Sequence, residues 1–322
     1  GALSMTLIAV AFDISWFFGA LEEYGLIVLR NMAVKCVGIV LLFLFIRTRN
    51  DLLLYVALTA ATGLLGNISM WGYLKPFVGK PDIRQLKPLR HLKETLVYFI
   101  PTIATSVYTI LDKTMLGWFT GGDKSQNGYY EYATGFVNMS KILIMSFNAV
   151  MSARMSYLFG AGKMDEVRER LCGSLDFVLL LAIPITLGLS GIAAGFVPWF
   201  LGADYLPVIT LMYVCAPLVF VVGLSDCLGS QILTPAGLRA QSGRVIVGGA
   251  AVNFILNLIL IPKFQSYGAA AASVAAECFI TFLYLRLGRN FVKLTLVWKY
   301  SWRRLIAGVC MFISVAVSGN AL

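Results

Sequence analysis

Charged residues are scarce in this chain of 322 residues, at 13% of the total, against about 25% in typical soluble domains. Hydrophobic residues make up 59%. These values exclude a globular domain that folds in water. The net charge of +10 would also suit a nucleic-acid-binding protein. However, the basic residues lie in short segments between apolar runs, so we expect no nucleic-acid partner.

Metal ligands are equally scarce. The chain has one histidine, His91, with no cluster of cysteines or carboxylates beside it, so a metal site is not expected. The six cysteines lie in or beside apolar runs, and no Cys-x-x-Cys pair occurs. This pattern indicates small apolar filler residues rather than disulfides or metal ligands.

Catalytic signatures are missing as well. The sequence contains no HExxH, no GxSxG, no Walker loop, and no GxGxxG after a strand. We therefore expect no enzymatic activity and no cofactor. Any uphill transport would have to be driven by an ion gradient, the membrane potential or downstream consumption. A membrane glycan polymerase or ligase remains an alternative, although that class tends to have a large extracytoplasmic loop and the outer loops expected here are short.

Long apolar runs dominate what is present. About ten segments of about twenty residues follow one another, and each is long enough to cross a hydrocarbon core of about 30 Å. Because the segments do not alternate in hydrophobicity, helices are favoured over a β-barrel. The sequence thus predicts an all-α integral membrane protein. The expected spans are residues 2–21, 26–46, 52–74, 95–119, 128–155, 172–201, 206–232, 241–262, 267–288 and 303–322.

Residues 75–94 form the longest polar segment, which is rich in lysine, arginine and proline. Because basic loops tend to stay in the cytoplasm, we expect a cytoplasmic linker here, with the first span running from outside to inside. The chain begins at Gly1 within one apolar run and ends at Leu322 within another. We therefore expect it to be a fragment, truncated at both ends.

Two neighbouring spans carry polar stripes at helical spacing. Side chains three and four residues apart share one face of a helix, and a polar face that wide is poorly suited to lipid. It should face either an internal cavity or another helix through interhelical hydrogen bonds. Lys141, about mid-span, favours the cavity. The stripes are Thr102, Thr105, Thr109 and Asp112 in the first span, and Glu131, Thr134, Asn138, Lys141, Asn148 and Ser152 in the second.

Further ionisable residues lie within the apolar runs. Arg30 is near a span end and either snorkels to the surface or faces a cavity, whereas Lys35 is deeper. A cation in a cavity suits a phosphate or carboxylate ligand, or pairs with a buried acid. The candidate acids could be ion or proton sites, or members of buried ion pairs. They are Asp13, Asp112, Glu131, Asp226 and Glu277.

Three sequence strings resemble a known family. They are FDISWFF at residues 12–18, TILDKTMLG at residues 109–117 and NFILNLILIP at residues 253–262. Their order and spacing resemble the Wzx-type polysaccharide flippases, a branch of the multidrug/oligosaccharidyl-lipid/polysaccharide exporter superfamily. The resemblance covers nearly the whole chain, although the third string recurs throughout the superfamily.

The resemblance implies a transporter of twelve to fourteen helices in two lobes around a central cavity. Residues 1–74 would be a three-helix remnant of the N-terminal lobe and residues 75–94 the inter-lobe linker. Residues 95–288 would be the six-helix C-terminal lobe, and residues 289–322 one additional, incomplete helix. On this frame, the chain resembles helices four to thirteen of fourteen.

The implied function is translocation of an undecaprenyl-pyrophosphate-linked oligosaccharide across the bacterial inner membrane, for polysaccharide or O-antigen biosynthesis, by alternating access. A polysaccharide polymerase and glycosyltransferases would be its partners. The basic residues that match the family's cavity are Arg30, Lys35, Lys113, Lys141 and Arg154. We add Asn138 and Asn148 from the polar stripe to this expected substrate-binding set.

A cation-coupled multidrug exporter of the same superfamily is the main alternative. It would use an acidic cavity, with Asp112, Glu131 or Glu277 as the ion site. The basic Lys35 and Lys141 argue against organic cations as substrates.

Overall fold

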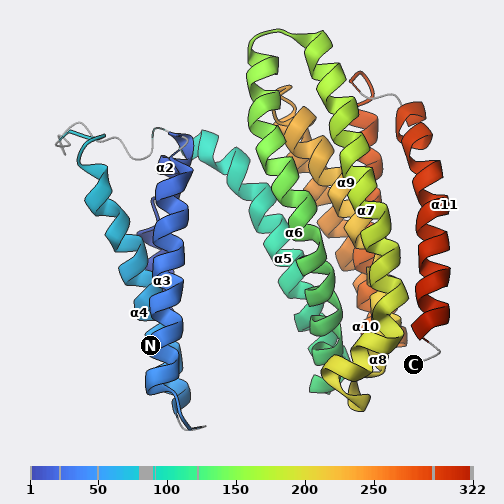
Figure 1. Cartoon of the computed structure of the whole chain (residues 1–322), viewed down its shortest axis with the longest axis horizontal. Helices are drawn as coiled ribbons and strands as arrows, with labels where there is room; N and C mark the ends of the chain where they lie inside the picture. The colour runs from blue at the N-terminus through green and yellow to red at the C-terminus, as the bar shows by residue number, and fades with distance from the viewer. Residues whose placement is uncertain are drawn as a thin grey trace. The chain divides into compact units, whose positions relative to one another are not determined.

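A computed structural model of the chain (Figure 1) describes residues 2–21, 23–48, 51–79, 90, 92–121, 123–291 and 294–319. These residues are almost entirely helical and contain no strand. Six helices in the described ranges are long and apolar enough to cross a membrane. The predicted all-α, multi-pass membrane protein is therefore confirmed.

Two compact units divide the chain, Gly1–Pro88 and Leu89–Leu322. The division falls within the expected linker, residues 75–94. Residues 80–89 and 91 of this linker, including the single histidine, lie outside the described part of the chain. The assignment of the units to two transporter lobes stays a prediction.

The first unit is a small helical bundle. Asn67 Nδ2 donates to the Ala9 carbonyl at 2.7 Å, and Trp71 Nε1 donates to the Phe12 carbonyl at 3.0 Å. These side chains satisfy carbonyls that are exposed where the first helix ends. The first expected span, residues 2–21, is interrupted, because α1 ends at Ala11 and α2 begins at Ser15. The helices of this unit are α1 (Ala2–Ala11), α2 (Ser15–Ala20), α3 (Tyr24–Phe45), α4 (Leu52–Trp71) and the short η2 (Gly72–Leu74).

The second unit is a larger bundle with one continuous apolar core. Buried residues of α6, α7, α8 and α9 supply most of that core, and α11 packs along α7. The helices are α5 (Leu92–Phe119), α6 (Lys124–Gly160), α7 (Met164–Leu201), α8 (Pro207–Cys215), α9 (Pro217–Leu228), the π-helical η6 (Gly229–Leu233), α10 (Arg239–Leu287) and α11 (Leu294–Gly319). A short 3₁₀ turn, η5 (Ala203–Tyr205), precedes α8.

Local chemistry marks the ends of these helices. Asp123 caps the N-terminus of α6, where its carboxylate accepts hydrogen bonds from the Ser125 hydroxyl at 2.6 Å and the Ser125 backbone N–H at 2.9 Å. The same two hydrogen bonds hold the pKa of the Asp123 carboxyl below its usual range. At the other end of α6, the turn at Gly162 adopts a positive φ of 70°, which glycine allows at no steric cost.

The helix labelled α10 is in fact two antiparallel spans. Gln265 has non-helical dihedrals, φ 51° and ψ −127°, and it breaks the helix just after Pro262. On either side of this break, Gly268 lies against the backbone of Leu260, and farther away Gly248 lies beside Phe279. The residues in contact lie at similar distances from the break on its two sides, which is the pattern of a hairpin. The expected spans 241–262 and 267–288 are therefore both present.

Gly268 is the residue that allows the two arms of this hairpin to approach. A Cβ there would overlap the backbone of Leu260 and Ile261, which cannot move aside as a flexible side chain would. We expect Gly268→Ala to destabilise the protein by about 1–3 kcal/mol, as overpacking does elsewhere. Thermal unfolding of the purified protein in detergent measures this. Gly173→Ala in α7, where a Cβ meets nothing within 4 Å, is the control and should not lower stability.

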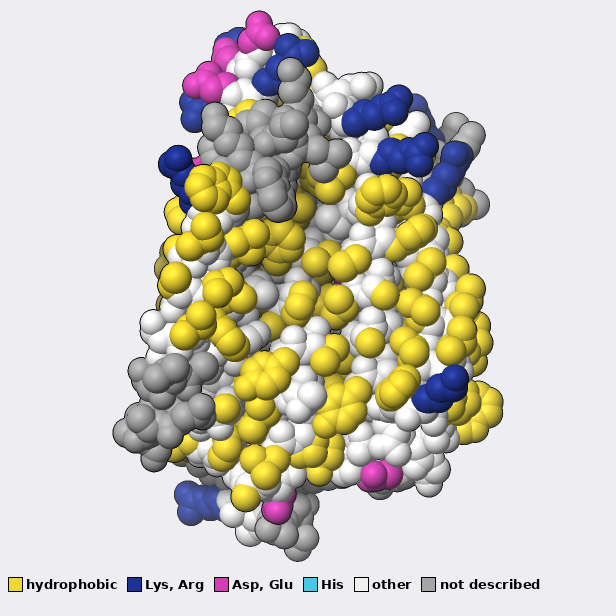
Figure 2. Space-filling view, turned by 90° about the vertical axis from the view of Figure 1, so that its right-hand side faces the viewer, with side chains coloured by type: hydrophobic (Ala, Val, Ile, Leu, Met, Phe, Trp, Pro, Cys, Tyr) yellow, Lys and Arg dark blue, Asp and Glu magenta, His cyan; other side chains and the backbone are white. Residues whose placement is uncertain are grey.

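The surface has the polarity of a membrane protein. In the face that Figure 2 shows, hydrophobic side chains form a broad band and most charged side chains gather at one end of it. The turn between α6 and α7 contributes charged pairs, with Lys163 Nζ 2.7 Å from Glu166 Oε1 and Arg168 Nη1 3.3 Å from Asp165 Oδ1. An apolar band of this kind is stable against lipid and not against water.

Candidate functional site

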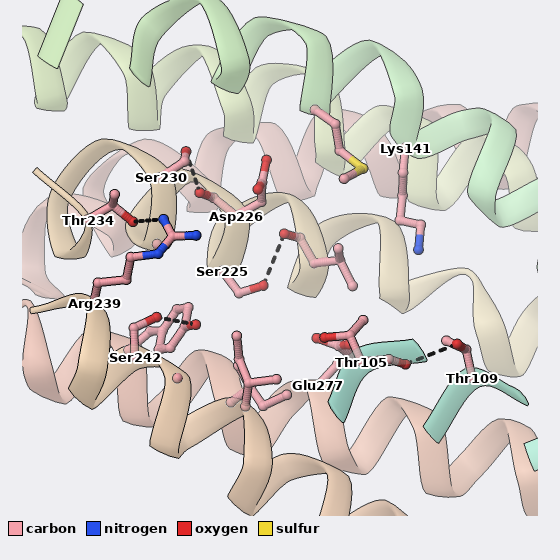
Figure 3. Close-up of a pocket in the computed structure, with 17 residues that line it drawn as sticks. Thr105, Thr109, Lys141, Ser225, Asp226, Ser230, Thr234, Arg239, Ser242 and Glu277 are labelled. Carbon is pink, nitrogen blue, oxygen red and sulfur yellow. Dashed lines mark hydrogen bonds between the residues drawn. The ribbon is translucent and has the colours of Figure 1, made fainter. Parts of the chain in front are cut away.

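A pocket with a volume of about 450 Å³ and several charged and hydroxyl side chains in its lining lies inside the second unit, between α5, α6, α9, η6 and α10 (Figure 3). We call it the major pocket, to distinguish it from a smaller one beside it. It brings together four charged side chains, Lys141 from α6, Asp226 from α9, and Arg239 and Glu277 from α10. Hydroxyl groups supply the rest of its polar lining, from Thr105, Thr109, Ser225, Ser230, Thr234, Ser242 and Tyr284.

A second pocket of about 130 Å³, the minor pocket, adjoins the first. The two share Thr109, Lys141, Val222 and Glu277 in their linings. The minor pocket is also lined by members of the two polar stripes and of α10, including Asp112, Lys113, Thr134, Asn138 and Ser273. Side chains at helical spacing on α5 and α6 thus face these two pockets, and the pockets form one polar region inside the bundle.

Asp112 lies at the wall of the minor pocket and is 1% exposed. Its carboxylate accepts hydrogen bonds from Asn257 Nδ2 at 2.5 Å, Ser273 Oγ at 2.8 Å and the Tyr130 hydroxyl at 3.0 Å. Asn257 also donates to Asn253 Oδ1 at 3.0 Å. Several donors therefore share one buried carboxylate, an arrangement that stabilises the ionised form and offsets part of its loss of hydration.

Lys141 is half-buried and enters the polar region where the two pockets meet. Lys113 lines the minor pocket as well, but it forms an ion pair with Glu131, and both of these side chains are about half exposed. An exposed pair of this kind contributes little to stability because water screens it. Of these two lysines, Lys141 is therefore the one positioned to act on a ligand inside the bundle.

Asp226 is held by α6 across the bundle. Asn148 Nδ2 donates to Asp226 Oδ2 at 2.9 Å and to the Gly223 carbonyl at 3.2 Å, and Asn148 Oδ1 accepts from Gln231 Nε2 at 3.0 Å. Ser152 Oγ donates to the Ser230 carbonyl at 2.9 Å. Asn148 is fully buried and does not line the major pocket, so it positions Asp226 instead of facing a ligand.

The π-helical η6 follows α9 directly and contributes to the wall of the major pocket. Its Thr234 N–H reaches back to the Gly229 carbonyl, 3.0 Å away, in place of the usual carbonyl four residues back. Such a bulge frees a backbone carbonyl and turns the neighbouring side chains, and it occurs often at functional sites. Here Gly229 and Ser230 of the bulge line the major pocket.

The remaining residues predicted from the sequence lie elsewhere. Arg154 is exposed on α6, with its guanidinium 5.2 Å from the centre of the Tyr157 ring, and it lines neither pocket. In the first unit, Arg30 and Lys35 line a separate pocket of about 410 Å³ between α3 and α4. Arg30 Nη1 donates to Asn67 Oδ1 at 3.3 Å. Asp13 is exposed and accepts from the Ser15 backbone N–H at 2.9 Å.

Of the residues that α10 contributes to the site, the sequence predicted Glu277 but not the others. Arg239, Ser242 and Tyr284 line the major pocket, and Ser242 Oγ donates to the Tyr284 hydroxyl at 2.6 Å. The span expected from the sequence, residues 241–262, begins just after Arg239 and leaves it outside the membrane. The spacing of three from Arg239 to Ser242 and of seven to Ile246, which also lines the pocket, is the signal that could have placed Arg239 on a pocket-facing stripe.

The sequence and the fold of this chain resemble those of known proteins. Residues 2–158 match the model of a family described as polysaccharide biosynthesis protein. The putative O-antigen transporter of Escherichia coli K12 is 22% identical over 286 residues, which cover 85% of this chain and 66% of that protein. The structure of the lipid II flippase MurJ, in an inward closed conformation, matches with a TM-score of 0.64 at 17% identity, over 91% of this chain and 65% of that one.

A transporter of the multidrug/oligosaccharidyl-lipid/polysaccharide exporter (MOP) superfamily from Pyrococcus furiosus matches with a TM-score of 0.53 at 18% identity, over 69% of this chain and 52% of that one. The helical fold of this chain therefore resembles the fold of transporters of the MOP superfamily. Within that class, the resemblance to the Wzx-type polysaccharide flippases, predicted from the three sequence strings, is confirmed. The chain spans about two thirds of the length of the relatives reported first, 66% and 65%.

Proposed function

We propose that this chain is part of a flippase that moves an undecaprenyl-pyrophosphate-linked oligosaccharide from the cytoplasmic to the outer leaflet of a bacterial inner membrane. Polysaccharide or O-antigen biosynthesis would consume the product, with glycosyltransferases and a polymerase as partners. The names of the relatives, which are transporters and flippases, support transport over enzymatic catalysis. The observation that carries the proposal is the major pocket, with Lys141 and Arg239 inside a membrane-spanning bundle.

The physical need for such a pocket follows from the cost of crossing hydrocarbon. A charged, hydroxyl-rich head group loses its hydration in lipid, at a cost of several kcal/mol for each unsatisfied group. Inside the bundle, cationic and hydroxyl side chains form hydrogen bonds to the head group in place of those that it made to water. Alternating exposure of that pocket to the two sides, by rocking of two lobes, would then transfer the head group.

A deletion strain tests the proposal directly. We expect loss of the full-length protein to abolish surface glycan and to cause lipid-linked oligosaccharide to accumulate in the inner leaflet, and a plasmid copy should restore both. Surface glycan is measured by gel and immunoblot. If the deletion leaves surface glycan intact but raises susceptibility to cationic drugs, the flippase assignment is wrong and the drug exporter is right.

A second candidate, the cation-coupled multidrug exporter of this superfamily, draws on Asp112. Within the described residues, no protein donor reaches the buried Asn257 Oδ1, beside the Asp112 carboxylate. The amide oxygen of Asn257 beside the buried carboxylate of Asp112 suits a small cation such as Na⁺ or a proton. Such a site would also serve a flippase as its coupling site. It therefore bears on the driving force more than on the substrate.

A further inference from the structure

The major pocket has different chemistry at its two ends. Figure 3 shows Arg239 and Lys141 at opposite ends of it, with Ser225 and Asp226 between them. At one end, Arg239 Nη1 donates to Thr234 Oγ1 at 3.5 Å, beside Ser242. At the other end, Glu277 joins Lys141 in the lining that the two pockets share. The pocket is therefore elongated and polarised.

The hairpin of α10 sets the distance between these ends. The hydrogen bond between Ser242 and Tyr284 places the two arms at the same level. From that level, Arg239 lies three residues farther from the break at Gln265 and Glu277 lies seven residues nearer to it. With a rise of about 1.5 Å per residue, the backbone positions of Arg239 and Glu277 are separated by about 15 Å along the helix axes. An extended ligand, not a single small ion, matches that span.

Each end selects a different chemical group. A guanidinium with hydroxyls beside it is suited to a phosphate or diphosphate, which it binds through two parallel hydrogen bonds. Beyond Arg239, two carboxylates line the pocket: Asp226 lies between the two ends, and Glu277 lies towards the end that holds Lys141. Carboxylates accept hydrogen bonds from sugar hydroxyls and from amino groups, but they repel another carboxylate.

We infer that the major pocket binds a sugar 1-phosphate or 1-diphosphate head group in one direction. The phosphate lies at Arg239, and a neutral or amino sugar, not a uronic acid, lies against Asp226 and Glu277. This inference rests on the proposed function and names the substrate class of its site. It goes beyond basic residues that attract an anion, because it assigns the direction of the ligand and the acidic residues that select the sugar.

A matched pair of soluble ligands tests the direction. Glucose 1-phosphate and glucuronic acid 1-phosphate differ only in the group at C6, which is a hydroxymethyl in one and a carboxylate in the other. We expect the purified full-length protein in detergent to bind the first about tenfold or more tightly than the second, because the carboxylates of Asp226 and Glu277 repel the uronate. Isothermal titration calorimetry measures both affinities.

Variants then assign the two ends. Arg239→Gln should weaken binding of glucose 1-phosphate about tenfold or more, and it should leave binding of methyl glucoside, which has no phosphate, unchanged. Arg239→Lys should retain part of the affinity. The double variant Asp226→Asn with Glu277→Gln should bring the affinities for the two ligands to within about twofold of each other. Arg244→Gln is the control, because Arg244 is exposed on the same helix and does not line the pocket.

Each result decides the inference. Equal affinity of the wild-type protein for both ligands, tighter binding of the uronate, no binding of either, or an Arg239→Gln variant with normal affinity would overturn it. The glycan-export experiment decides the proposed function separately. A strain that exports glycan normally without the protein disproves the flippase, whatever the binding shows. Loss of export together with equal binding of the two ligands disproves only the inference.

Discussion

Export of glycan by the full-length protein is expected to fall at least about tenfold when Lys141 is replaced by alanine, while the amount of protein in the membrane stays near the wild-type level. The reason is that Lys141 stands where the major and minor pockets meet, half-buried within a membrane-spanning bundle. A hydrogen bond to a charged group contributes about 1.5–3 kcal/mol, which corresponds to about 10- to 150-fold in binding. The free-energy cost of burying a cation offsets the attraction to Glu277 that is lost with it, so its removal should change the stability of the fold little.

Two further variants separate charge from packing. Lys141→Arg keeps the positive charge and should retain part of the export activity, whereas Lys141→Gln, which is polar but neutral, should resemble alanine. Lys163→Ala is the matched control, because Lys163 is exposed in the turn between α6 and α7, where it pairs with Glu166 and lines neither pocket. Wild-type export by Lys141→Ala would remove Lys141 from the substrate-binding set.

Apolar length and helical spacing carried most of the fold prediction. Spans of about twenty apolar residues could be placed because lipid requires each to satisfy its own backbone. The same spacing put Thr105, Thr109 and Lys141 on pocket-facing stripes, as the structure has them. These are local properties of single helices, and a sequence displays local properties directly.

Properties that depend on two helices at once could not be derived in this way. Asn148 continues the stripe of Lys141, yet it is fully buried against α9, where it holds Asp226. Arg154 has the charge of a cavity residue but lies over the ring of Tyr157. Periodicity assigns a residue to a face, but only the packing of the neighbouring helix decides whether that face meets a pocket or a partner.

The same limit explains why Arg239 was missed. Arg239 begins α10 after the π-helical stretch and the short turn that follows that stretch. No sequence rule predicts a π-helix. The break at Gln265 then folds α10 back on itself, which brings Glu277 and Tyr284 to the pocket that Arg239 also lines. A reversal between two apolar spans is predictable, but the residues that it aligns depend on the geometry of the turn.

Asp112→Asn is the second substitution with a large expected effect. The carboxylate accepts three hydrogen bonds, from Asn257, Ser273 and Tyr130, in a site with almost no exposure to solvent. An asparagine presents an NH₂ group to some of these donors, which leaves at least one buried donor unpaired. We expect a loss of stability of about 1–3 kcal/mol, measured by thermal unfolding in detergent, and a larger loss of export per molecule of protein.

The cation hypothesis adds a sharper readout to this variant. If the Asp112 carboxylate holds a coupling Na⁺, the wild-type protein should unfold at a higher temperature in Na⁺ than in choline. If it holds a coupling proton, the protein should unfold at a higher temperature at a lower pH than at neutral pH. In both cases, a ligand that binds only the folded state stabilises it. Asp112→Asn should abolish that difference, whereas Asp165→Asn, at a fully exposed site in the α6–α7 turn, should preserve it. An Asp112→Asn protein that exports glycan normally and keeps the cation effect would show that this carboxylate has only a packing role. If the wild-type protein shows no cation effect and the Asp112→Asn variant is unstable, Asp112 has a structural role in the bundle. The coupling site would then lie elsewhere.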